Sequence, residues 1–156
     1  MQEKKVFGFD IDGVLSFFLG LRCLNWLMRQ RKLANRLMRF SIGKFIYKIR
    51  RPNKELRALL VQLDQAGHTI TIISFMPEVY RQEVETWLVC HAIPFHTVLL
   101  PILGEDEISF RVRAIQETGC HIYVDDDGQN IETLALLVSA KVIQFKDATL
   151  DVSDLL

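Results

Sequence analysis

The chain has few cysteines and no long uninterrupted hydrophobic run, and these two shortages exclude several classes of protein. Its three cysteines, Cys23, Cys90 and Cys120, are odd in number and lack the spacing of a metal site, which predicts buried thiols in a reducing compartment. The strongly apolar stretch of residues 14–28 contains an arginine and is shorter than the ~18 residues that a membrane-spanning helix needs. The charged start, residues 1–5, leads directly into a strand-like segment and lacks the pattern of a signal peptide. We therefore predict a cytoplasmic protein.

Acidic residues are missing from residues 14–51, although the whole chain has as many acidic as basic side chains. This segment holds ten of the 19 Lys and Arg residues, whereas the remaining nine share the rest of the chain with all 19 Asp and Glu residues. Such an uneven distribution predicts a local surface for an anionic partner. The length of 156 residues predicts one domain, residues 1–156, with a basic helical insert at about residues 16–51.

The insert carries basic and apolar residues at helical spacing, including a basic ridge of four cations at steps of three and four. The ridge consists of Arg29, Lys32, Arg36 and Arg39. Two interpretations remain open. The ridge is either the solvated face of an amphipathic helix, or part of a contact through residues 29–51 with an anionic membrane surface or nucleic acid. The second interpretation adds peripheral membrane attachment as an alternative to a purely cytoplasmic location.

Strand-like and helix-like segments alternate along the rest of the chain. A first buried strand ends at Asp10. Further strands are predicted at residues 69–73, 95–100, 121–124 and 141–145, and helices at about residues 53–66, 78–91, 108–117 and 129–138. This alternation predicts an α/β fold, a three-layer Rossmann-like parallel sheet with helices on both faces.

Polar side chains follow three of the predicted strands. Asp10 and Asp12 share one face of the chain before a glycine turn, Ser74 follows the second strand, and Asp125 and Asp126 follow the fourth. Ligands of open α/β sheets bind beyond the carboxyl ends of the strands. Carboxylates gathered there could not all ionise without a cation, and Mg²⁺ prefers carboxylate oxygen. The sequence therefore predicts a Mg²⁺ site, although each group alone is also explained by turn formation or helix capping.

Taken together, these motifs resemble those of the haloacid dehalogenase-like (HAD) superfamily of aspartate-nucleophile phosphatases. Residues 9–14 read Phe-Asp-Ile-Asp-Gly-Val and match its first motif, and residues 69–74 match the apolar strand that ends in Ser or Thr. Asp125, Asp126 and Asn130 match the fourth motif. The third motif is a Lys before the fourth, and Arg111 stands about there, with Arg113 as a less favoured substitute. The resemblance covers the predicted sheet but not the basic insert, which lies where the family places a cap.

The resemblance implies a role for each matching residue. Asp10 would attack phosphorus and form an aspartyl-phosphate, and Asp12 would act as general acid and then general base. Ser74 and Arg111 would contact the phosphoryl group. A bound Mg²⁺ would neutralise charge between nucleophile and phosphate. Its implied ligands are Asp10, Asp12 through its backbone carbonyl, and Asp126, with Asp125 or Asn130 assisting.

Residues 52–98 are also similar to the branch with polynucleotide 3′-phosphatases and acid-phosphatase-like enzymes. The segment after the second strand, residues 74–77, reads Ser-Phe-Met-Pro where that branch often has Thr-x-Arg-Pro. Phe75 therefore joins Ser74 and Arg111 as a predicted substrate contact, while Met76 removes an expected arginine. Asp127 followed by glycine offers a second register for the fourth motif. The predicted function is a Mg²⁺-dependent phosphomonoester hydrolase, and the alternative is a catalytically weak binding protein that docks on a membrane or nucleic acid.

Overall fold

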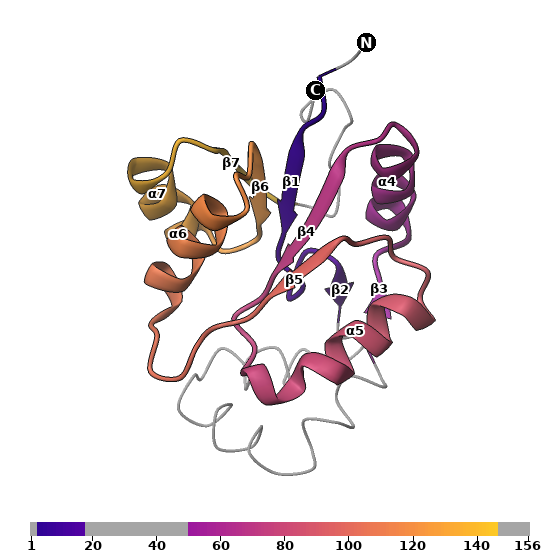
Figure 1. Ribbon diagram of the computed structural model, residues 1–156, viewed down its shortest axis with the longest axis horizontal. Coiled ribbons are helices and arrows are strands. Elements are labelled where there is room, and N and C mark those ends of the chain that lie inside the picture. The colour runs from indigo at the N-terminus through magenta and orange to yellow at the C-terminus, as the bar shows by residue number, and fades with distance from the viewer. Residues whose placement is uncertain (1–2, 18–49, 147–156) are drawn as a thin grey trace.

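The computed structural model describes residues 3–17 and 50–146 and contains a five-stranded parallel sheet (Figure 1). The strands lie in the order β5-β4-β1-β6-β7. Their bounds are β1 Val6–Phe9, β4 Thr69–Ile73, β5 Thr97–Leu99, β6 Ile122–Asp125 and β7 Lys141–Gln144. The predicted α/β class and parallel sheet are therefore confirmed, and the strands at residues 95–100 and 141–145 are shorter than predicted.

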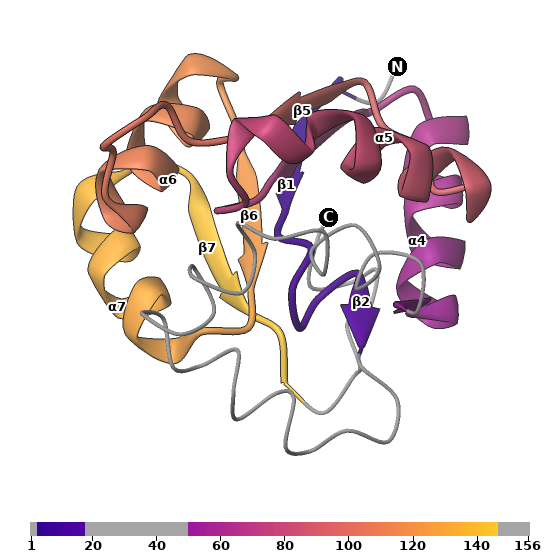
Figure 2. The same ribbon diagram turned by 90° about the horizontal axis from the view of Figure 1, so that it is seen from below.

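Within the described residues, helices cover both faces of the sheet, which produces the predicted three layers (Figures 1 and 2). One face packs against α4 Lys54–Gln65 and α5 Arg81–Cys90, the latter preceded by the short 3-10 helix η1 Glu78–Tyr80. The other face packs against α6 Glu107–Glu117 and α7 Gly128–Leu137. Toward the first pair of helices, β1 and β4 present large apolar side chains. Phe7, Phe9, Ile70 and Ile72 are each completely buried there.

Successive strands are added toward one edge of the sheet from β1 through β4 to β5, and toward the opposite edge from β6 to β7. The direction therefore reverses between the neighbouring strands β1 and β6. From β1 the chain passes through α4 to β4 and through α5 to β5, whereas β6 leads through α7 to β7 on the opposite side. Parallel pairing aligns Phe9 with Val124, so both strands end at the same edge. Reversal points of this kind are where open α/β sheets bind their ligands.

Local sequence signals explain where the helices begin. Asn53, Asp106 and Asp127 each stand just before a helix and accept hydrogen bonds from two backbone amides of its first turn. These side chains satisfy amides that have no partner within the helix. The helices at residues 108–117 and 129–138 begin one residue earlier than predicted for this reason.

The ends of the predicted insert are strands and not helices. β2 Ser16–Phe17 pairs antiparallel with β3 Arg51–Pro52, and the amide of Asn53 donates to the carbonyl of Leu15 over 2.8 Å. The backbone hydrogen bonds of a two-stranded ladder override helical spacing at the three of these positions that belong to the predicted insert, Ser16, Phe17 and Arg51. Residues 18–49, which include the basic ridge, lie outside the described residues. The contact of the ridge with an anionic partner therefore stays a prediction.

The cysteine prediction was wrong for one of the two cysteines that the structure describes. Cys120 is buried, but Cys90 is exposed at the end of α5. The buried stripe of α5 consists of Val84, Trp87 and Leu88, and Cys90 falls off that stripe. Cys23 lies outside the described residues. Within residues 3–17 and 50–146, no helix combines the length and hydrophobicity needed to cross a bilayer.

Candidate active site

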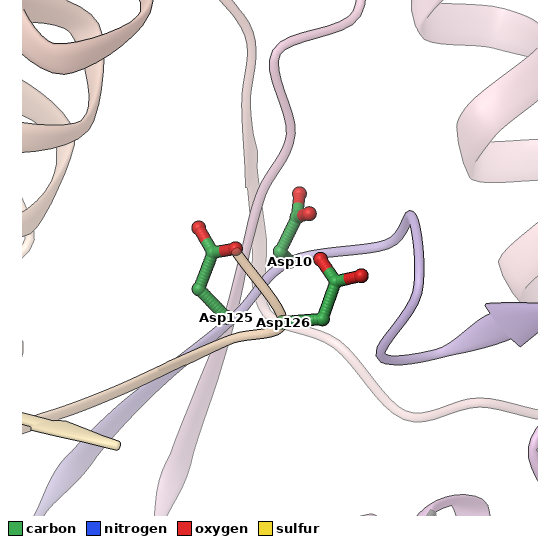
Figure 3. A group of neighbouring side chains, drawn as sticks. All are labelled: Asp10, Asp125 and Asp126. Carbon is green, nitrogen blue, oxygen red and sulfur yellow. The ribbon is translucent and has the colours of Figure 1, made fainter. Parts of the chain in front are cut away.

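Three carboxylates meet where β1 and β6 end. Asp10 follows β1 directly, Asp125 is the last residue of β6, and Asp126 follows it. Oxygens of the three side chains all lie within 4.8 Å of one another, and Figure 3 shows the carboxylates projecting to the same side of the two chain segments. The amide of Asp10 donates to the carbonyl of Val124 over 3.0 Å, which ties the two segments together. Asp10 and Asp125 are buried, whereas Asp126 is exposed.

The turn at Gly13 makes room for Asp126. Gly13 has a φ of +82°, a left-handed conformation that residues with a side chain rarely adopt. A Cβ at this position would lie only 1.9 Å from Oδ2 of Asp126. The turn is closed by a hydrogen bond from the amide of Ser16 to the carbonyl of Ile11 over 2.9 Å. Glycine is therefore needed here both for the backbone angle and for the close approach of a carboxylate.

The electrostatics of this cluster favour a bound cation. Burial, followed by the nearby charge of Asp125, raises the pKa of Asp10 well above its usual value. Asp126 is exposed as a residue, but the protein around its carboxyl group partly removes that group from water, and this desolvation together with the charge of Asp125 raises its pKa to about 6. A cation among the carboxylates would remove the repulsion that raises these values. Because all three groups offer hard oxygen ligands at short mutual distance, the residues present fit Mg²⁺.

Arg111 is the cation that the chain itself supplies to this cluster. Its Nε lies 2.7 Å from Oδ2 of Asp125, and its Nη2 lies 3.7 Å from Oδ2 of Asp10. Burial alone would lower the pKa of Arg111, but Tyr123, Asp10 and the other acidic groups around it raise it overall. The guanidinium is therefore a permanent charge beside Asp10.

Two residues that the sequence analysis missed hold Arg111 in this orientation. Oε1 of Glu107 lies 2.6 Å from Nη1 of Arg111 and also accepts a hydrogen bond from Asn130 over 3.1 Å. The hydroxyl of Tyr123 accepts from Nε of Arg111 over 3.0 Å and donates to Asp125 over 2.9 Å. Both residues had a signal in the sequence. Glu107 precedes Arg111 by one helical turn, and Tyr123 lies two positions before Asp125 on the same face of the strand.

Asp12 is not one of the three clustered carboxylates, and its side chain pairs with Arg50. Nη1 of Arg50 lies 2.7 Å from Oδ1 of Asp12, and the Arg50 side chain is fully buried while 46% of the Asp12 side chain is exposed. Arg50 had no role in the sequence analysis, because it was counted with the other cations of the insert. Its contact with Asp12 depends on the β2–β3 pairing, which sequence spacing does not reveal.

Several solved structures have a similar fold. A chain of the Pnkp1/Rnl/Hen1 RNA repair complex superposes on 91% of this chain with a TM-score of 0.64 at 17% identity. The HAD family enzyme bt-2542 from Bacteroides thetaiotaomicron matches 99% of this chain and 98% of its own, with a TM-score of 0.59 at 14% identity. A HAD-superfamily hydrolase from Ehrlichia chaffeensis covers 91% and 93% of the two chains with a TM-score of 0.53 at 13% identity. The fold is HAD-like.

This confirms the predicted resemblance at the level of the HAD-like fold. The chain spans 42% of the length of the RNA repair chain that it matches. No protein-family model matches the sequence, and neither does any curated protein.

The remaining predicted contacts, Ser74 and Phe75, directly follow β4. Ser74 is fully buried at the end of β4, and its hydroxyl has no hydrogen-bond partner among the described residues. Phe75 is partly exposed, and its ring lies 5.9 Å from the ring of Phe110 on α6. Met76 is buried in the core on the side of α4 and α5, so it does not replace the missing arginine as a substrate contact.

The alternative residues for the third and fourth motifs, Arg113 and Asp127, make contacts outside the carboxylate cluster. Arg113 pairs with Glu105 and Glu117 at the surface of α6, at 2.8 Å in each case. Asp127 is the N-cap of α7 and accepts from two backbone amides. Asn130 donates its side-chain amide to Glu107, so its described contact supports Arg111 and not the carboxylate cluster.

Proposed function

We propose that this chain is a Mg²⁺-dependent phosphomonoester hydrolase that acts through an aspartyl-phosphate on Asp10. One observation carries the proposal: the Asp10 carboxylate belongs to a three-carboxylate cluster and also lies 3.7 Å from the Arg111 guanidinium, at the edge where β1 and β6 end. Such a place can hold a cation and an anionic phosphoryl group next to the same nucleophile. The HAD-like fold is consistent with this chemistry.

Mg²⁺ would be held by Asp10, Asp126 and Asp125, with the backbone carbonyl of Asp12 completing the protein ligands. When bound, the ion would neutralise charge between the nucleophile and the phosphoryl oxygens. Arg111 would contribute a second fixed positive charge, because Glu107 and Asp125 hold its guanidinium in place. The hydroxyl of Ser74 would donate to a phosphoryl oxygen, which would give this buried donor a partner.

The reaction would proceed in two displacements. In the first, an oxygen of Asp10 attacks phosphorus, the ester P–O bond breaks, and the departing oxygen takes a proton from the Asp12 carboxyl group. In the second, water attacks the same phosphorus and gives its proton to Asp12. The bond between phosphorus and Asp10 then breaks, which releases inorganic phosphate and restores both carboxyl groups. Asp12 is exposed enough to exchange protons with substrate and water.

The test is a hydrolysis assay with p-nitrophenyl phosphate, glycerol 2-phosphate and a 3′-phosphorylated oligonucleotide. The oligonucleotide is included because one structural neighbour belongs to an RNA repair complex. We expect release that requires Mg²⁺, stops with EDTA, and is lost in Asp10→Asn while the variant stays folded. Full activity of Asp10→Asn would contradict the aspartyl-phosphate. A folded, Mg²⁺-treated protein that hydrolyses no substrate would instead favour the alternative of a HAD-like binding protein.

A further inference from the structure

Arg50 stands at the base of the predicted insert, directly next to the turn that carries Asp12. It immediately precedes β3, whose pairing aligns Phe17 with Arg51. A bridge between Asp12 and Ser16 fixes the turn to the start of β2. The segment that leaves the sheet after Phe17 therefore returns at Arg50 within reach of the Asp12 carboxylate.

The backbone of Arg50 is fixed from the other side by α5. The indole nitrogen of Trp87 donates to the Arg50 carbonyl over 3.3 Å, and 5% of Trp87 is exposed. A buried polar contact of this kind resists displacement, because breaking it leaves a buried carbonyl without a partner. Arg50 is thus held by the β2–β3 ladder and by an anchored side chain from a core helix.

The ion pair between Arg50 and Asp12 is asymmetric in burial. The Arg50 side chain is fully buried and the Asp12 side chain is about half exposed, although Nη1 of Arg50 lies 2.7 Å from Oδ1 of Asp12. Leaving a buried cation without a counter-charge costs much free energy. An exposed carboxylate, in contrast, can adopt several rotamers in which water solvates it. The buried partner therefore determines where the exposed partner points.

We propose that Arg50 is a positioning residue that orients Asp12 for proton transfer and so couples the base of the insert to the acid-base step. The inference rests on the proposed function. Proton transfer requires the donor to lie within hydrogen-bond reach of the reacting oxygen, so an unrestrained Asp12 transfers protons less efficiently. Arg50 itself does not take part in the bond changes described for Asp10 and Asp12.

The two displacements depend on Asp12 to different degrees, which provides a readout. With p-nitrophenyl phosphate, the weakly basic leaving group departs with little help from an acid, but hydrolysis of the aspartyl-phosphate still needs Asp12 to take a proton from water. Loss of orientation should therefore slow the second displacement more than the first. The expected signature is a burst of p-nitrophenolate, close to one per protein molecule, followed by a slow steady phase.

The experiment compares rapid-mixing kinetics of the wild type, Arg50→Met, Arg50→Lys and Asp12→Asn, with unfolding temperatures measured for each. The matched control is Arg57→Met, because Arg57 is an exposed arginine on α4 whose guanidinium donates to the carbonyl of Ala92. We expect Arg50→Met to lower the steady rate by about tenfold or more with a burst rate near that of the wild type, as in Asp12→Asn. Arg50→Lys should restore at least part of the steady rate, and Arg57→Met should match the wild type.

The outcomes separate this inference from the proposed function. A wild type without Mg²⁺-dependent release would overturn the proposed function and, with it, the role of Arg50. An active wild type with a folded Arg50→Met variant that keeps its steady rate, or loses burst and steady phases equally, would overturn the role of Arg50 alone. Should Arg50→Met not fold, the neutral polar variant Arg50→Gln decides by the same split, and wild-type kinetics in both of its phases would overturn the inference. In an Asp12→Asn background, Arg50→Met should have no further effect on either phase.

Discussion

Arg111 and Asp125 form a buried ion pair, with 2.7 Å between Nε and Oδ2, that joins helix α6 to the end of strand β6. The side chain of Asp125 is fully buried, and 4% of the side chain of Arg111 is exposed. The same guanidinium reaches Glu107 and Asp10, so one arginine compensates three carboxylates. This relationship makes Arg111 a structural and an electrostatic part of the candidate site at once.

We predict that Arg111→Ala lowers both the stability and the phosphatase rate. Removing one partner of a buried ion pair typically costs about 3–5 kcal/mol in the free energy of unfolding, because a buried charge loses its counter-ion. The matched control is Arg113→Ala, two residues away, whose surface pairs with Glu105 and Glu117 should be worth about 0–1 kcal/mol. Urea unfolding and steady-state kinetics measure the two effects. Equal losses of unfolding free energy and of rate in the two variants would contradict the assignment of these effects to the buried ion pairs of Arg111.

Gly13→Ala should impair Mg²⁺ binding specifically. Its new Cβ would meet Oδ2 of Asp126 at 1.9 Å, so the exposed carboxylate must turn away from Asp10. Gly67→Ala is the control, because Gly67 has a similar φ of +84° with no atom within 4 Å of the new Cβ. Both variants should lose about 1–2 kcal/mol from the left-handed backbone. Isothermal titration with Mg²⁺ should show weaker binding in Gly13→Ala alone, and wild-type affinity there would contradict the assigned cation site.

The stability of the Mg²⁺-free protein should respond to pH through Asp126. Its pKa is raised to about 6 in the folded protein from 3.8, mainly by burial and by Asp125. The folded state therefore binds more protons than the unfolded state between these values, and its contribution to stability is lost as pH rises toward 6. In EDTA, the unfolding temperature of the wild type minus that of Asp126→Asn should decrease as the pH rises through this window. Added Mg²⁺ should remove the decrease by compensating the carboxylate, whereas a difference that rises with pH would contradict the direction of the shift.

Ser74→Ala should separate substrate binding from folding. The Ser74 hydroxyl is buried and has no partner among the described residues, so its removal should leave the free energy of unfolding unchanged or higher. If the hydroxyl donates to a phosphoryl oxygen, KM for p-nitrophenyl phosphate should rise several-fold. Thermal unfolding and steady-state kinetics on the same preparation provide both measurements. A large loss of stability with an unchanged KM would assign Ser74 to the core.

The sequence by itself determined the elements and the edge at which polar side chains gather. Period-two apolar segments and helix caps such as Asn53 and Asp127 are local signals, and a residue that follows a parallel strand must lie at that strand's carboxyl end. The positions of Asp10, Ser74, Asp125 and Asp126 at or just after the ends of their strands were therefore readable from the sequence, and the HAD-like fold was implied by the resemblance of these motifs.

Only the tertiary structure decided which side chains meet at that edge. Strand order places β6 beside β1, which brings Asp10 and Asp125 together across 115 positions of sequence, and no periodicity encodes that neighbourhood. The pairing of β2 with β3 brings Arg50 to Asp12, and it replaces helix at both ends of the segment that had been predicted as helical. Burial of Asp10, partial desolvation of Asp126 and the charge of Asp125 beside both raise the pKa of Asp10 and of Asp126. Desolvation and long-range pairing arise from packing, because they depend on all neighbours of a residue and not on its place in the chain.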